Sequence, residues 1–174
     1  MINLSELGER LSFWQKVLIG LFLYIICTSL GLFLSSHGWA KLLGQPGNKF
    51  EYWDLQHYAN LSLNWRCWAF YPLWPQILRA FQPQDSFTAI QYALTISNLI
   101  FIASLPITLL TLNRLIQSST LSFIIFLLYI LNPNSIFHGN GYTESLFSFL
   151  GIIAIFCLRS PRSLLGNAIL GVSI

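Results

Sequence analysis

Two short stretches of the chain carry the acidic residues that could do chemistry. The first contains Asp54 and His57 in WDLQHY, and the second contains Glu144 in YTESLF. A carboxylate close to an apolar phase is costly unless it is paired or used, so we interpret Asp54 as functional. Two acids that face one cavity could transfer a proton or bind the hydroxyl groups of a sugar.

Each of these acids also has a structural interpretation. Asp54 could be a solvated loop residue that hydrogen-bonds to His57, and a helix would place the two, three residues apart, on one face. Glu144 falls in the first turn of a predicted helix, where a carboxylate complements the helix dipole. Both interpretations stay open at this point, and we expect His138 to be a polar loop residue.

Aromatic residues surround the first acid, within residues 51–75. Trp and Tyr are enriched at membrane interfaces, where the ring is buried and its polar atom is hydrated. We therefore interpret Trp65, Trp68 and Trp74 as residues of an interfacial belt. This explains the rings, but it does not explain the carboxylate of Asp54 between them.

The composition of the whole chain indicates an integral membrane protein. Its 174 residues are 55% hydrophobic and 9% charged, and the mean hydropathy is +0.61. The net charge of +3 comes from scattered residues, so we expect no nucleic-acid partner. The three cysteines lack the spacing of metal ligands, and we expect no disulfide framework, no metal and no cofactor.

Four apolar runs predict transmembrane helices, since a helix needs about 20 residues to cross a bilayer. They cover about residues 17–34, 87–112, 120–131 and 142–158, and a fifth run over 163–174 is too short to span. Pro106 is expected to kink the second helix. The sequence therefore predicts an all-α polytopic membrane helix bundle of about four to five transmembrane helices, with residues 1–174 as a single membrane domain.

Basic residues orient these spans, because Lys and Arg in short loops stay on the cytoplasmic side. The loop between the third and fourth spans contains neither, so it is predicted to face the other side together with residues 35–86. This non-cytoplasmic loop is expected to include a short surface-lying or re-entrant helix over residues 75–81, after Pro72. Both acids then lie on the non-cytoplasmic face. The basic residues on the cytoplasmic side are Arg10, Lys16, Arg114, Arg159 and Arg162.

Four motifs give the chain a resemblance to a known family. They are W-D-x-x-H-Y from Trp53, A-F-Y-P-L-W-P from Ala69, N-P-x-S-I-F from Asn132 and Y-T-E-S-L-F from Tyr142. In order and spacing they resemble the PIG-V family, the enzymes similar to GPI mannosyltransferase 2 and their bacterial relatives, in the GT-C class of membrane glycosyltransferases. The resemblance implies a multi-pass enzyme that takes mannose from a polyprenyl-phosphate carrier on the non-cytoplasmic face.

The resemblance also implies partners and a location. The partners would be the polyprenyl-phosphate sugar donor, a lipid-linked or glycolipid acceptor, and membrane lipid. The membrane would be the plasma membrane of a bacterium or the endoplasmic reticulum membrane of a eukaryote. Members of the family are longer, so the chain would correspond to the N-terminal half of the family unit, and a second chain could supply the other half.

Roles for individual residues follow from the same resemblance. Asp54 would be the catalytic carboxylate, with Glu144 as the second acid of the site, and His57 would orient Asp54 or bind the acceptor. Arg66 is added from its residue type, because a guanidinium beside aromatic rings could bind the carrier phosphate, although a solvent-facing position is an equal alternative. The other expected substrate-binding residues are Trp53, Tyr71, Pro72, Tyr142 and Thr143.

A non-enzymatic role is the alternative. The chain could be a non-catalytic multi-pass subunit, or an inactive fragment, of a glycolipid assembly system. A transporter is disfavoured, since transporters typically contain internal repeats and polar residues in the middle of their spans. Here the polar residues lie at the ends of the spans and no repeat is found.

Overall fold

The residues that the structure describes form helices. The computed structural model describes residues 8–34, 53–64, 73–132 and 141–158, with no strand among them. Each of the four predicted apolar runs coincides with a helix, so the all-α prediction is confirmed. In chain order the helices are α2 (Phe13–Leu34), α4 (Trp53–Leu63), α5 (Leu73–Ala80), α6 (Ser86–Leu115), α7 (Ser119–Leu131) and α9 (Glu144–Leu158).

Two of these helices, α2 and α6, are long and apolar enough to cross a membrane. A stripe on α2 is exposed as well as apolar, with more than half of the surface of Trp14, Leu18 and Phe22 uncovered. Such a stripe is costly in water and suits contact with hydrocarbon. Helices α7 and α9 are apolar but have 13 and 15 residues, so their crossing of the bilayer stays a prediction. The short run over 163–174 lies outside the described residues.

Helix α6 is the central element, against which α2, α4, α5, α7 and α9 all pack. It has 30 residues and continues through Pro106. Small residues at a spacing of four, Ala89, Ala93 and Ser97, are completely buried on it. Small side chains allow helix backbones to approach closely, which is how helices associate when lipid surrounds them. Ala93 of this stripe packs in one cluster with Leu55 and Tyr58, so the stripe lies where α4 approaches α6.

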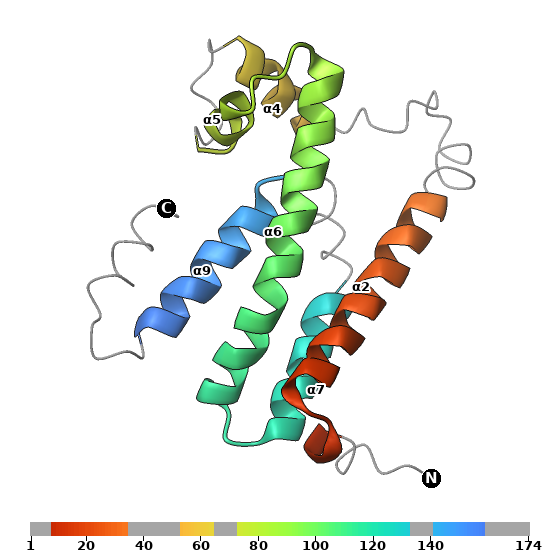
Figure 1. Ribbon diagram of the computed structural model, residues 1–174, viewed down its shortest axis with the longest axis vertical. Helices are drawn as coiled ribbons and strands as arrows, with labels where there is room; N and C mark the ends of the chain where they lie inside the picture. The colour runs from red at the N-terminus through yellow and green to blue at the C-terminus, as the bar shows by residue number, and fades with distance from the viewer. Residues whose placement is uncertain (1–7, 35–52, 65–72, 133–140, 159–174) are drawn as a thin grey trace.

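Helices α4 and α5 pack beside the N-terminal half of α6 (Figure 1). Helix α5 confirms the short helix predicted near residues 75–81, although it begins earlier, at Leu73. Pro75 is tolerated because it falls in the first turn, where backbone N–H groups have no partner within the helix. Trp74, Pro75 and Leu78 are buried against the rest of the protein. The assignment of residues 35–86 to a non-cytoplasmic loop stays a prediction.

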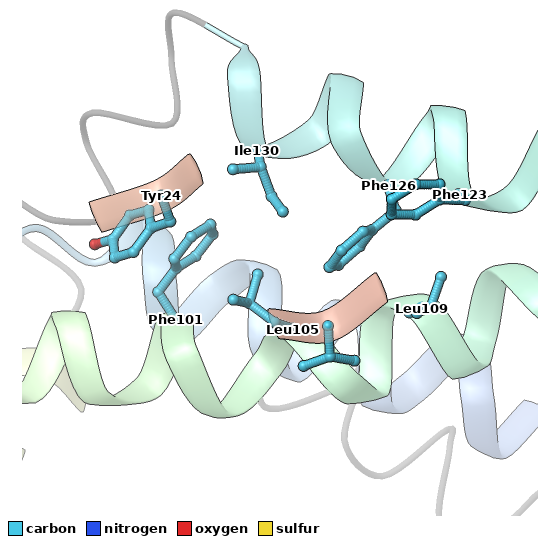
Figure 2. Close-up of a cluster of buried hydrophobic side chains, with 8 residues drawn as sticks. Tyr24, Phe101, Leu105, Leu109, Phe123, Phe126 and Ile130 are labelled. Carbon is cyan, nitrogen blue, oxygen red and sulfur yellow. The ribbon is translucent and has the colours of Figure 1, made fainter. Parts of the chain in front are cut away.

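An apolar core joins α2, α6 and α7 (Figure 2). The ring centroids of Tyr24 and Phe101 lie 4.5 Å apart, and the Tyr24 hydroxyl donates a hydrogen bond to Asn98 Oδ1 at 2.6 Å. One turn earlier on the same face of α2, a Cβ on Gly20 would lie 2.5 Å from the ring of Phe126. The glycine therefore allows α7 to pack directly against the backbone of α2.

Two basic residues lie at the end of the bundle away from α4 and α5, whereas Arg79 lies in α5. Lys16 near the start of α2 donates a hydrogen bond to Ser119 Oγ at the start of α7. The guanidinium of Arg114, near the end of α6, lies 3.9 Å from the ring centroid of Phe156 in α9. The structure thus brings these two basic residues to the same end of the bundle (Figure 1). That this end faces the cytoplasm stays a prediction, and Arg159 and Arg162 lie outside the described residues.

A cap at the start of α6 should make stability depend on pH. The Asp85 carboxylate accepts a hydrogen bond of 2.7 Å from the backbone N–H of Thr88, and this bond holds the pKa of the carboxyl below its usual value. Because the pKa of Asp85 is lower in the folded state than in the unfolded state, its ionised carboxylate stabilises the fold at pH values above the unfolded pKa. This stabilisation is lost as the pH falls through the folded pKa. We expect Asp85→Asn to remove this pH-dependent part of the stability, because Asn still caps the helix but does not titrate. Thermal unfolding in detergent between about pH 7 and about pH 3 would test this, and an identical pH dependence in both proteins would contradict it.

Candidate functional site

The segment that leads into α9 is fixed at Gly141. This residue is buried, and its φ of 78° is in the left-handed region that favours glycine. Its N–H donates to Ser97 Oγ on α6 at 3.1 Å, and its carbonyl accepts from Trp74 Nε1 on α5 at 3.0 Å. One peptide residue thereby connects three parts of the fold that are distant in sequence.

Helix α4 reaches the same point. A Cβ built on Gly141 would lie 2.8 Å from Leu55 Cδ1 and 3.2 Å from the backbone nitrogen of Leu94. Leu55 directly follows Asp54, and Gly141 precedes Glu144 by three residues. Leu55 of α4 therefore lies beside Gly141, although the helices α4 and α9 themselves have no Cα atoms within 8 Å of each other.

A second apolar cluster surrounds this contact. Tyr142 and Leu146, on either side of the start of α9, pack against it. The cluster is separate from the core between α2 and α7, so the start of α9 has its own packing support. Its buried members come from α4, α5 and α6 and are Leu55, Tyr58, Trp74, Leu78 and Ala93.

The structure describes the whole Y-T-E-S-L-F motif, which begins at Tyr142. Glu144 is the first residue of α9, as predicted, and it is exposed. Tyr142 and Thr143 are half-buried, and the Thr143 carbonyl accepts the backbone N–H of Phe147 at 2.9 Å. The dipole interpretation of Glu144 thus fits its position, and the same position also leaves its carboxylate accessible to a substrate.

For the first motif, the structure gives the backbone and part of the side chains. Trp53 and Asp54 are the first two residues of α4, and His57 follows one turn later with an exposed side chain. The helical condition that puts Asp54 and His57 on one face is therefore met. The side chains of Trp53 and Asp54 are not among those described, and Arg66, Tyr71 and Pro72 lie outside the described residues.

Trp74 corrects one of our interpretations. We predicted a belt residue at the membrane interface, but Trp74 is completely buried and its indole N–H is bonded to the Gly141 carbonyl. Ser97 was not singled out, and Gly141 was predicted only to be part of a turn. The local signals for them were weak, because a serine in an apolar helix and a glycine in a turn have many uses. Trp65 and Trp68 lie outside the described residues.

Fold and site together define the class of the protein. It is a helical protein with two candidate membrane spans, in which the start of α4 meets Gly141, three residues before Glu144, beside α6. A family model described as Mannosyltransferase (PIG-V) matches residues 36–173, which include α4, α5, α6, α7 and α9. The chain belongs to this mannosyltransferase family. Searches among curated proteins and among solved structures give no match.

Membership has direct consequences for the kind of activity. The family is one of mannosyltransferases, so a glycosyltransferase function is indicated. Together with the two candidate spans it indicates a membrane protein. The matched region contains every element that contributes to the contact at Gly141, and so the candidate site lies within the family unit.

Proposed function

We propose that this chain is a GT-C type mannosyltransferase that uses a polyprenyl-phosphate sugar donor. It would move a hexose to a lipid-linked or glycolipid acceptor on the non-cytoplasmic face of its membrane. Membership in the mannosyltransferase family supports the reaction type. The face is supported by the predicted topology, in which both acids lie away from the short loops that contain Lys or Arg, and the donor is the one that the family resemblance implies.

The observation that carries the proposal is the contact of Leu55 with Gly141. It brings the start of α4, with Asp54, beside Gly141, which precedes Glu144 by three residues. This junction lies beside the N-terminal half of α6, whereas Lys16 and Arg114 are near the opposite end of the bundle (Figure 1). A site there would be open to a lipid-linked donor that approaches along the bilayer.

In the proposed reaction, Asp54 acts as the general base. It would take the proton of an acceptor hydroxyl while that oxygen attacks the anomeric carbon of the donor sugar. The bond between that carbon and the phosphate oxygen would break, and polyprenyl phosphate would leave with the bonding electrons. The Asp54 carboxyl would then pass its proton to solvent, which regenerates the base.

The other predicted residues would bind and orient the substrates. His57, one turn after Asp54, would orient the carboxylate or bind the acceptor. Glu144, with Tyr142 and Thr143, would line the pocket from the side of α9 and accept hydrogen bonds from sugar hydroxyls. The carrier phosphate would be bound by Arg66, and the rest of the pocket would come from Trp53, Tyr71 and Pro72.

Sugar transfer in isolated membranes would test the proposal. Membranes that hold the chain would be given mannose labelled on polyprenyl phosphate or, in parallel, on a nucleotide, with membranes lacking the chain as the control. We expect labelled glycolipid from the lipid-linked donor alone. Transfer from the nucleotide donor alone would reject the proposed donor, and no transfer by folded, inserted protein would favour the alternative of a non-catalytic subunit.

A further inference from the structure

We propose that Trp74 and Ser97 are positioning residues that hold the first turn of α9 in the geometry required for sugar transfer. They act through the backbone of Gly141 and need not touch either substrate. The inference rests on the proposed function for its consequence on transfer. Its structural part, that two side chains determine where α9 begins, stands on the geometry alone.

Three hydrogen bonds in sequence carry this inference. The indole N–H of Trp74 donates to the Gly141 carbonyl, and the Gly141 N–H donates to Ser97 Oγ. The Ser97 hydroxyl in turn donates to the Leu94 carbonyl at 3.1 Å. Because the Ser97 proton is directed to Leu94, a lone pair of its oxygen is available to Gly141. We call this series the Gly141 relay.

The relay is unusual in the origin of its groups. Backbone groups just before a helix are commonly bonded by nearby side chains or by water. Here the two partners of Gly141 come from other helices, 67 and 44 residues away in sequence. Trp74 and Ser97 are both completely buried, so a broken bond would leave a polar group without water. The backbone at Gly141 is thus fixed from two directions.

The relay is well placed to control the site. Gly141 is buried, whereas Glu144, three residues later, is exposed. A small rotation of the backbone at Gly141 would therefore move the part of α9 that faces the substrates. Catalysis depends steeply on such placement, since a misplacement of about 1 Å can cost about 100-fold in rate. Removing the relay should lower kcat more than it changes KM.

Two substitutions remove one bond each, and Ser97→Ala does so with little change of shape. Trp74→Phe also removes ring volume from a completely buried position, so a loss shared with Ser97→Ala is the part due to the hydrogen bonds. Trp74→Phe keeps an aromatic ring without the N–H, and Ser97→Ala removes the hydroxyl. The matched control is Thr111→Val, since Thr111 is also a buried hydroxyl residue of α6 but bonds to Ile107 within its own helix. Ser97→Thr retains a hydroxyl and should restore part of the transfer.

The expected result has two parts. Trp74→Phe and Ser97→Ala should lower kcat per folded protein by about 10- to 100-fold, whereas Thr111→Val should leave it unchanged. They should also raise the rate at which a polar thiol reagent labels Thr143→Cys. The labelling background replaces Cys27, Cys67 and Cys157 with Ser, and Cys27 and Cys157 are free thiols in the structure.

The two measurements separate the possible failures. If the relay variants lose thermal stability but keep wild-type kcat and labelling, the inference is wrong and the relay is only structural. If the wild-type chain transfers no mannose, the proposed function fails. Labelling of Thr143→Cys then still decides whether Trp74 and Ser97 hold the start of α9.

Discussion

Asp54→Asn should lower mannose transfer by about 100- to 10,000-fold, which is the usual contribution of a positioned general base. Asn has nearly the same size as Asp and still accepts hydrogen bonds, but its amide does not take a proton at neutral pH. The acceptor hydroxyl would then attack without a base. Initial rates with labelled polyprenyl-phosphate mannose, divided by the amount of inserted protein, would measure the loss.

Asp85→Asn is the matched control for this experiment. It makes the same chemical change at an exposed acid that caps α6 and that we place outside the reaction. Transfer by Asp85→Asn should equal that of the wild type at neutral pH. Wild-type transfer by Asp54→Asn would exclude Asp54 as the base, and an equal loss in both variants would point to a general effect of removing negative charge.

The helices could be predicted because the apolar runs are long and their ends have clear signals. Helix α7 covers Ser119–Leu131, within one residue of the predicted run, and the Ser118 side chain caps it by accepting the N–H of Leu121. Helix α6 extends slightly beyond its predicted range at both ends, with Asp85 as its cap. The apolar run and the capping residue both depend on neighbours in sequence, so they can be recognised in a single sequence.

The contact at Gly141 could not be predicted in the same way. The sequence marks Gly141 as a turn residue, but it does not say that Leu55, Trp74 and Ser97 converge there. These residues come from α4, α5 and α6, and their meeting depends on how tightly α6 packs against its neighbours. Burial of Trp74 is a result of the same packing, which is why its residue type alone led to the wrong interpretation.

The family motifs and the physical contacts explain each other at this point. The resemblance drew attention to W-D-x-x-H-Y and Y-T-E-S-L-F without a reason for their joint occurrence. The structure supplies one, because Leu55 lies within the first motif and Gly141 directly precedes the second. A further motif, A-F-Y-P-L-W-P, includes Trp74, whose indole N–H donates to the carbonyl of the same glycine. Three motifs thus meet at one residue.

Gly141→Ala is expected to be the most damaging single change at this junction. With φ at 78°, an alanine would be strained by about 1–3 kcal/mol even in open space. Its Cβ would also lie 3.2 Å from the Leu94 nitrogen and 3.3 Å from the Ala93 carbonyl carbon, which are backbone atoms that do not move easily. We expect a lower midpoint of thermal unfolding in detergent and loss of most transfer activity.

Gly151→Ala, inside α9, provides the control. A Cβ on Gly151 would meet no atom of the described residues within 4 Å, and its φ is not in the left-handed region. Alanine is favoured over glycine inside a helix by about 0.5–1 kcal/mol, so this variant should be as stable as the wild type or slightly more stable. If Gly141→Ala proved equally harmless, the backbone at this point would be free to shift. Neither the contact of Leu55 with Gly141 nor the Gly141 relay could then determine where Glu144 lies relative to Asp54.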